Sequence, residues 1–541
     1  MKSFLIFALT FLMVSIQVQS QNIEVRFGAL LPSDRRSVVL DAGVVGEKMF
    51  VIERQNKNLC LKIYDPSSLN FLSSKIIQKS SCKGISDCVP TKFSLEKTIF
   101  MKDNFLMLFN SYDKTTKQNV LMAQKITSEG KFEGDLTIVD KIDAKNRFNA
   151  GSYMTWQSED SSKFLVVQNP PYEKYNDEKF TFKVYDSELT NLSNFSVSLP
   201  YKDKNVSVVD YYLSNTGDIY MLVNVLKEEK VKGEDRSFYS ILSLDGKDGT
   251  LSEYDLKLDN KDIEDVALRI DEKTKKVICS GLYSDISKGY TGKKIDGLFY
   301  LRLDITKKTI DAKGFKAIDN SVIAAILDIS EKKVDKKSKA SAESKYFEIM
   351  DVIPMKDSTT RLITEYRKLV IVTTTTCDGK GACHTTTNYH YYRKNIFVIT
   401  IGHDGSIKSF TDIPKYQHTV NDGGKFSSFV ICQKGDRMYF LFNDNVENLN
   451  ESVTSIKDVK PMVRLGKACL VACELNKDGT YTKEKVYDIA EKKIVMMPES
   501  AIKVADGEYV IPIQQAPPKG FSCSCITMFS KMKTGIAKIT L

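Results

Sequence analysis

Short apolar stretches alternate with polar turns along most of this chain. In each copy of the pattern an apolar run meets Asp, Asn, Gly, Ser or Lys and is followed by a second run. The copies are Ile63–Asn70, Ile126–Lys131, Val184–Glu188, Leu242–Gly246, Leu303–Thr306, Ile401–Gly405, Leu475–Gly479 and Phe529–Gly535. Several of these turn residues tolerate positive φ or bond their own backbone, as a hairpin tip requires. The pattern predicts consecutive antiparallel strands that form stacked sheets.

The turns recur at a nearly constant spacing. The first five turn centres are 57 to 64 residues apart, and the next two intervals are 100 and 74; these centres are Asp65, Glu129, Asp186, Asp245, Asp304, Asp404 and Asp478. A four-stranded blade with its loops needs ~45–60 residues. We therefore predict an all-β fold, a β-propeller of eight four-stranded antiparallel blades, with seven blades as the alternative. Residues 24–30 are the candidate strand that closes the last blade from the other terminus.

The longest interval contains a basic segment at 319–346. Asn320 or Ser321 can cap a helix, and the following apolar residues fall at helical spacing. Residues 331–345 are rich in lysine and lack an apolar stripe. We interpret 319–346 as a helical insertion on the propeller rim followed by a solvated tether. The alternative is a docking element for an acidic partner or an anionic envelope polymer.

Residues 366–394 form a second unusual segment in the same interval. Pairing Cys377 with Cys383 places a run of threonines on two strands opposite one another, with Ile371 opposite Tyr389. Cross-strand Thr pairs stabilise a two-stranded ribbon modestly. Because neither face of the outer half is apolar, the ribbon is expected to protrude into solvent. It is either a rigid surface ribbon or a recognition arm that uses Tyr389, Tyr391, Tyr392 and Arg393.

The N-terminus predicts export. Residues 1–20 read as a signal peptide, with Lys2 in the n-region, an apolar run from Phe4 to Val14 and a small residue at Ser20. The mature propeller would then comprise 21–541, in the periplasm or outside the cell. No later stretch reaches the ~20 apolar residues of a membrane-spanning helix. The net charge of +9 is dispersed over 78 basic and 69 acidic residues, which indicates a solvated lysine-rich surface and argues against nucleic acid as a partner.

Eleven cysteines in an exported chain permit disulfides. Two pairs share one spacing, Cys82 with Cys88 and Cys377 with Cys383, and both are predicted to form local bridges. Cys523 and Cys525 lie close to a methionine, Met528, and soft ligands of this kind can hold Cu(I) or Zn(II). Core packing or cross-blade disulfides are the preferred interpretation for these and the other remaining cysteines, Cys469 and Cys473 among them.

Part of the chain resembles a known family. The resemblance rests on Gly314-Phe315, Leu362–Tyr366, Ile413–Gln417, Asn421–Gly424 and Tyr439–Asn445. These segments are similar to exported, uncharacterised proteins of Bacteroidota, and the similarity covers about 315–450. It implies a propeller-like fold and a cell-envelope setting, and it implies no catalytic residues.

Motifs that carry chemistry are scarce. The sequence has no HExxH, GxSxG or P-loop pattern and only four histidines, so we expect no metal centre and no cofactor. Asn443–Asn448 has oxygen ligands that a calcium loop could use, although a turn held by side-chain bonds is preferred. Lys415, Gln417 and Asp422 lie between consecutive units, where propeller loops line one face, and are the candidate binding residues. Glu365 and Tyr366 could join them.

These observations favour a non-enzymatic, exported β-propeller that acts as a binding or scaffold protein in the cell envelope, with a protein or a glycan as its partner. Propellers often serve as rigid platforms, and no nucleophile and base are paired in the sequence. The alternative is a hydrolase or lyase that acts on envelope carbohydrate or peptide through carboxylates that converge only in the fold. The second alternative is a soft-metal binding protein.

Overall fold

The computed structural model describes residues 17–19, 23–33, 37–79, 89–229, 237–258, 260–285, 295–319, 346–377, 383–450, 452–516 and 532–541. Most of the predicted signal peptide, the interior of the 319–346 insertion and the cysteines Cys82, Cys88, Cys523 and Cys525 lie outside these residues.

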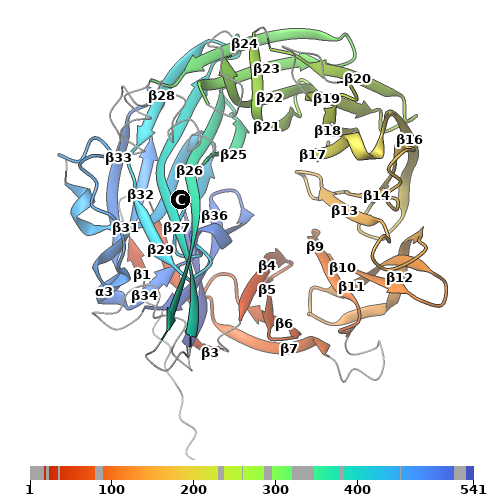
Figure 1. Cartoon of the computed structure of the whole chain (residues 1–541). Coiled ribbons are helices and arrows are strands. Elements are labelled where there is room, and N and C mark those ends of the chain that lie inside the picture. Colours follow the sequence, from red (N-terminus) through yellow and green to blue (C-terminus); the bar gives the residue numbers. More distant parts are fainter. Residues whose placement is uncertain are drawn as a thin grey trace, which may run out of the picture.

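Eight sheets follow one another around a ring, and each contains a four-stranded antiparallel blade (Figure 1). Blades 1 to 4 run in chain order, with the first strand of each blade innermost. Their strands are β4 (Val38–Val45), β5 (Lys48–Gln55), β6 (Asn58–Tyr64) and β7 (Phe71–Lys79); β9 (Ser94–Phe100), β10 (Asn104–Asp113), β11 (Gln118–Thr127) and β12 (Phe132–Asp143); β13 (Ser152–Gln157), β14 (Phe164–Asn169), β15 (Asp177–Tyr185) and β16 (Asn191–Lys202); β17 (Val206–Leu213), β18 (Ile219–Leu226), β19 (Ser237–Leu244) and β20 (Leu251–Leu256).

Blades 5 to 8 complete the ring. Their strands are β21 (Lys261–Asp271), β22 (Lys276–Asp285), β23 (Gly297–Asp304) and β24 (Thr309–Ala317); β25 (Phe347–Pro354), β26 (Thr360–Cys377), β27 (Cys383–Ile401) and β28 (Ile407–Ile413); β30 (Val430–Lys434), β31 (Arg437–Asn445), β32 (Ala468–Leu475) and β33 (Tyr481–Asp488); β35 (Ile502–Ala505), β36 (Glu508–Gln515), β37 (Met532–Thr540) and β2 (Glu24–Phe27). Short added strands are β1 (Gln17–Gln19), β3 (Leu31–Ser33), β8 (Val89–Pro90), β29 (Gln417–Val420) and β34 (Ile494–Met496).

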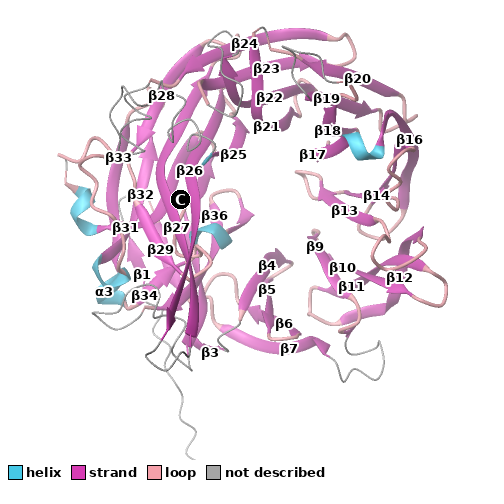
Figure 2. Cartoon of the chain, in the orientation of Figure 1, coloured by secondary structure: helices cyan, strands magenta, loops and turns pink. Residues whose placement is uncertain are grey.

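The predicted eight blades are therefore confirmed, and the seven-blade alternative is wrong. Closure by an N-terminal strand is also confirmed, because β2 pairs antiparallel with β37 and supplies the outer strand of blade 8. In Figure 1 the red N-terminal strands accordingly lie beside the blue C-terminal strands. Figure 2 shows how little helix accompanies the strands. Within the described residues the short helices are η1 (Asp203–Asn205), η5 (Val446–Leu449), η6 (Leu465–Lys467), α3 (Ile489–Lys492) and η7 (Pro498–Ser500).

Packing between blades explains the hydrophobic pattern of the strands. The second and third strands are covered on both faces by neighbouring blades, so they read as continuous apolar runs; Phe105 to Phe109 in β10 is buried throughout. Fourth strands form the outer rim and are largely polar, as in β16. Eight apolar clusters occupy the eight junctions between successive blades. The cluster that joins Ala42 and Met49 to Val510 and Ile536 closes the ring between blades 1 and 8.

The recurrent turns found in the sequence connect the third strand of a blade to its fourth. Seven blades use them, and an Asp carboxylate often accepts the backbone N–H groups of the turn; Asp65 accepts from Ser67 and Ser68. The Ser67 hydroxyl also donates to Asp65, and this bond, together with those from the Ser68 N–H and hydroxyl, lowers the pKa of Asp65 to about 2. The eighth predicted turn, Phe529–Gly535, is wrong in its described part, because β37 runs straight through Gly535. Blade 8 needs no such turn, since its fourth strand comes from the N-terminus.

Strands β26 and β27 extend far beyond blade 6 as the predicted ribbon. Their register pairs Thr373 with Thr387 and Cys377 with Cys383, as expected from the sequence. The Cys377–Cys383 disulfide is present at the tip. Among the described residues, no helix has both the length and the apolar character needed to cross a membrane.

Val25 of the closing strand β2 is fully buried between blades 7 and 8, so shortening its side chain should destabilise the closed ring. Val25→Ala is expected to lower the free energy of unfolding by about 2 kcal/mol, because it opens a cavity in the core. The matched control is Val38→Ala, at a position 54% exposed, which is expected to change stability by less than about 0.5 kcal/mol. Urea denaturation of both variants measures the difference. Equal effects would show that the N-terminal strand is not an integral part of blade 8.

Candidate functional site

The ribbon leaves the ring at an end where several connections converge. In an up-and-down antiparallel blade, the loop from strand two to strand three and the link from strand four to the next blade lie at the same end. The root of the ribbon therefore meets residues 414–429, which link blades 6 and 7, and residues 489–501, which link blades 7 and 8. Strand β29 belongs to the first link and pairs with β27 at the root.

An ion pair with no solvent exposure lies at this root. The Nζ atom of Lys415 is 2.5 Å from Oε1 of Glu365, and both side chains are completely buried. Burial lowers the pKa of Lys415, and the neighbouring Glu365 carboxylate opposes that shift. The second carboxylate oxygen of Glu365 accepts a hydrogen bond of 2.7 Å from the Ser428 hydroxyl. One strand of the ribbon is thereby tied to both ends of the link between blades 6 and 7.

Gln417 extends the hydrogen-bond network around this ion pair. Its Oε1 atom accepts from Lys415 Nζ at 2.9 Å and from the backbone N–H of Ser428 at 2.7 Å. Its Nε2 group donates to the carbonyls of Ser428 and Asn443. A buried amide with all these bonds made fixes one arrangement of the chain, because any other would leave polar groups unpaired.

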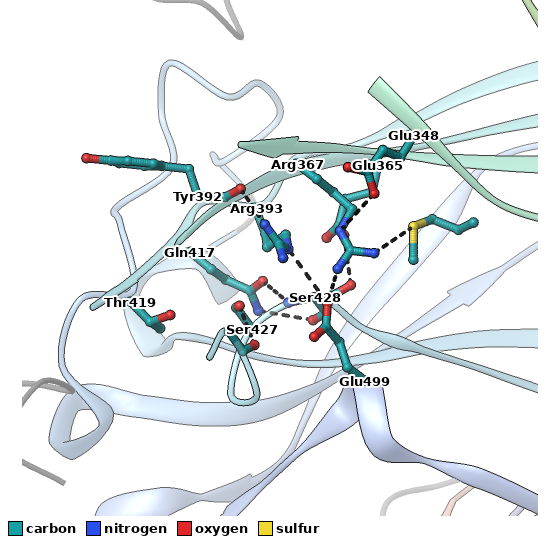
Figure 3. A network of polar contacts seen from close by, with 12 residues as sticks. Glu348, Glu365, Arg367, Tyr392, Arg393, Gln417, Thr419, Ser427, Ser428 and Glu499 are labelled. Carbon is teal, nitrogen blue, oxygen red and sulfur yellow. Dashed lines mark hydrogen bonds and ion pairs between the residues drawn. The ribbon is translucent and has the colours of Figure 1, made fainter. Parts of the chain in front are cut away.

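Two arginines face each other across the ribbon strands. Arg367 of β26 and Arg393 of β27 are register partners, and both reach the carboxylate of Glu499 in η7 (Figure 3). Arg367 also lies 3.6 Å from Glu365 and 3.5 Å from Glu348. Burial raises the pKa of Glu499, and the two guanidinium groups oppose that shift. The carboxylate from the link between blades 7 and 8 thus offsets two like charges that would otherwise repel at the root.

Asp422 and Asp444 stabilise the turns around the root. The Thr419 hydroxyl and the Gly424 N–H donate to Asp422 Oδ1, each at 2.8 Å, while burial raises the pKa of Asp422. Asp444 accepts from the backbone of Asn445 and the side chain of Asn448, and burial raises its pKa to about 6. Residues 443–445 end strand β31 and residues 446–449 form η5, whose N-cap Asn445 accepts from the Glu447 N–H, so the side-chain bonds preferred from the sequence are present.

The ribbon surface carries the aromatic residues. Tyr392 stacks on His418 with ring centroids 4.3 Å apart, and a ring nitrogen of His418 lies 3.1 Å from one of His390. Figure 3 shows the Tyr392 ring directed away from the ion-pair network. On the opposite face Tyr389 is 42% exposed and stands opposite Ile371, which is 57% exposed. Leu369 is also exposed, so an apolar and aromatic stripe lies between the charged root and the threonines near the tip.

A cavity of about 330 Å³ lies elsewhere, along the innermost strands of blades 2 to 4. Its wall includes Glu96 and Lys97 of β9 and the only tryptophan of the chain, Trp156 of β13. Desolvation raises the pKa of Glu96 although its side chain remains accessible. Because innermost strands surround the centre of the ring, this cavity faces the propeller axis.

The structure brings together only part of the predicted site. Lys415, Gln417, Asp422 and Arg393 meet at the root but are buried, so they do not form an open binding mouth. Tyr389, Tyr391 and Tyr392 lie on the ribbon surface, and Glu365 belongs to the buried ion pair while Tyr366 lies in the core. Four further residues of this region were not predicted from the sequence: Arg367, His418, Ser428 and Glu499. Extending the ribbon register inward from Cys377–Cys383 pairs Arg367 with Arg393, a signal that a carboxylate must lie nearby.

Metal ligands do not assemble in the part of the chain that the structure describes. No group of three or more His, Cys, Asp or Glu side chains there could hold an ion. Cys60, Cys279, Cys432, Cys469 and Cys473 are buried free thiols, in keeping with the core-packing interpretation. Burial raises the pKa of Cys469 and Cys473 to about 12, so both stay protonated.

No protein family matches the chain by sequence, and no curated protein does. Solved structures with a similar fold include the β-propeller domain of the Trilobed protease from Pyrococcus furiosus, with 12% identity, a TM-score of 0.33, and coverage of 84% of this chain and 97% of that one. Another is the WD40 domain of SCAP from fission yeast, with 8% identity, a TM-score of 0.39 and 97% coverage of both chains. These similarities concern the propeller fold only.

The buried ion pair at the root predicts a large effect of removing one partner. Lys415→Met is expected to lower the free energy of unfolding by about 3–5 kcal/mol, since it removes the nearest counter-ion of the buried Glu365 carboxylate and leaves only Arg367, 3.6 Å away. Adding Glu365→Gln to the Lys415→Met variant is expected to recover part of the lost free energy of unfolding. The control is Lys202→Met, which removes an exposed ion pair with Asp177 and is expected to cost less than about 1 kcal/mol. Chemical denaturation gives all three values, and similar losses for both lysines would contradict this account.

Proposed function

We propose that this protein is an exported, non-enzymatic β-propeller that serves as a binding or scaffold protein of the cell envelope. The ribbon formed by β26 and β27 is its recognition element. The observation that carries the proposal is a stiff projection with an exposed aromatic stripe: Tyr389 and Ile371 are accessible, the tip is closed by a disulfide, and the root is fixed by the buried Lys415–Glu365 pair.

Rigidity at both ends favours binding. A ligand-binding element that is ordered before it meets its partner loses less conformational entropy on association. Exposed tyrosines give large contact areas with few rotatable bonds, which is why they are enriched at interfaces. A protein partner fits the stripe best, because its apolar residues alternate with hydroxyl groups and it carries no charge of its own.

The envelope setting is supported by two features. The N-terminal residues have the composition of a signal peptide, and a disulfide at an exposed tip persists in oxidising compartments. The resemblance of about 315–450 to exported proteins of Bacteroidota points the same way.

The recognition role predicts that Tyr389→Ala weakens partner binding without unfolding the propeller. Truncating a central interface tyrosine typically costs ~2 kcal/mol or more, about a 30-fold loss of affinity. The measurement is capture of envelope proteins on the tagged mature chain, with quantitative mass spectrometry of what is retained. The control is Tyr172→Ala, which removes a tyrosine 52% exposed outside the ribbon. If both variants retain a recurrent partner equally well, the ribbon is not the recognition element.

A hydrolase or lyase acting on envelope carbohydrate or peptide is the second candidate. The cavity beside Trp156 favours it, because an accessible carboxyl group with a raised pKa, Glu96, lies next to an aromatic surface. A carboxyl group whose pKa is raised is a better proton donor to a leaving group than an unperturbed one.

This second candidate predicts that the purified mature chain releases reducing ends or amino groups from isolated envelope polymers. Glu96→Gln is expected to lower that rate by ~10²-fold or more, as for loss of a general acid. Glu47→Gln, at an exposed turn position of blade 1, serves as the control and is expected to keep full activity. If the wild-type chain releases neither reducing ends nor amino groups, the hydrolase or lyase candidate is wrong and only the binding role stays.

A further inference from the structure

Among the strands that the structure describes, none pairs with one edge of the ribbon. Strand β25 pairs with β26 only as far as Tyr366, and the Lys368 ammonium then lies over the Tyr346 ring. From Leu369 to Cys377, β26 pairs on one side with β27, and none of the described residues forms a strand on its other side. The backbone N–H and C=O groups along this edge face outward, which makes the edge a template for a further strand.

This edge lacks the features that normally protect such strands. Natural proteins place charges, prolines or bulges on exposed edges to prevent pairing with other chains. Residues 369–377 read Leu-Val-Ile-Val-Thr-Thr-Thr-Thr-Cys, with no charge and no proline, and their register with β27 has no bulge. Ile371 is 57% exposed and Val372 is 41% exposed. The edge therefore combines high β-propensity with an exposed apolar surface.

The other edge of the ribbon is partly occupied. The backbone N–H of Tyr389 donates to the side chain of Asn421 at 2.8 Å, and the N–H of Asn421 donates to the Tyr389 carbonyl at 2.9 Å. Strand β29 covers His390 to Arg393 on the same edge. The part of the β27 edge that stays open is shorter than the open edge of β26. It contains His384 and Asn388, which have lower β-propensity than the valines and threonines of β26.

We propose that the edge of β26 from Leu369 to Cys377 pairs antiparallel with the same edge of a second copy of this chain. The dimer would be isologous, with the two-fold axis near Thr373, and would join two ribbons into one four-stranded sheet. It deepens the proposed function, since it names a partner for one edge of the ribbon and leaves the aromatic stripe accessible for the envelope partner.

Self-complementarity is what selects a second copy as the partner. With the axis at Thr373, Val372 stands opposite Thr374 of the other copy and Ile371 opposite Thr375, so like charges never meet. The ribbon already contains this kind of pairing: the hydroxyls of Thr373 and Thr387 lie 3.2 Å apart, and those of Thr375 and Thr385 lie 3.0 Å apart. A two-stranded ribbon in water is marginal by itself, whereas four strands form a stable sheet.

The test compares two threonines that face each other across the ribbon. Thr374→Lys puts a charge on the open edge of β26, and Thr386→Lys puts the same charge on its exposed register partner in β27. Light scattering after size exclusion is expected to give twice the monomer mass for the wild-type mature chain and for Thr386→Lys. Thr374→Lys is expected to dissociate at least 10-fold more readily. Circular dichroism and thermal melting confirm that both variants are folded.

Three results would overturn the dimer. These are a monomeric wild-type chain at its highest soluble concentration, a Thr374→Lys variant that stays as dimeric as wild type, and dissociation of Thr386→Lys to the same extent. The ribbon's recognition role is tested separately. Tyr389→Ala is expected to lose the envelope partner and remain dimeric, whereas Thr374→Lys is expected to be monomeric and keep the partner. The recognition role and the dimer can therefore fail independently of each other.

Discussion

Closure of the ring is the constraint on which the rest of this structure depends. Each blade is a thin sheet whose inner strands are apolar on both faces, and neither face is covered until the blades on both sides are in place. The pairing of β2 with β37 supplies the last outer strand, and the cluster around Met49 and Ile536 then covers the first and last blades together. The contact that completes the core thus joins residues from opposite ends of the chain.

The ribbon depends on that closed ring for its direction. Its root is held by Glu365 from blade 6, by Lys415 and Gln417 from the following link, and by Glu499 from the link into blade 8. A buried ion pair gives little net stability, but it permits few alternative arrangements, because each charge needs its partner. Blade 6 and the two links thus hold the root of the ribbon at three points. The polar network between these points fixes the direction in which the ribbon projects.

Sequence reasoning was most successful where physical constraints are local. Turn residues such as Asp65 and Asp404 bond their own backbone, so spacing and blade number could be read from the chain. The Cys377–Cys383 loop set the ribbon register for the same reason. Phe529–Gly535 resembled another turn because Ser, Lys and Gly also occur within strands, and only the topology of blade 8 shows that no turn is needed there.

The candidate site was less predictable because its parts are distant in the sequence. Lys415 and Gln417 were identified as polar residues in a link, but polarity alone does not distinguish a solvated loop from a buried network. Glu499 could be matched to Arg367 and Arg393 only by knowing that the blade 8 link passes the ribbon. Five buried cysteines of the described residues carry free thiols: Cys60, Cys279, Cys432, Cys469 and Cys473. Under the export proposed above, these thiols would be protected from wrong cross-links in an oxidising compartment only after the blades have packed, so slow assembly of the ring would favour covalent misfolding.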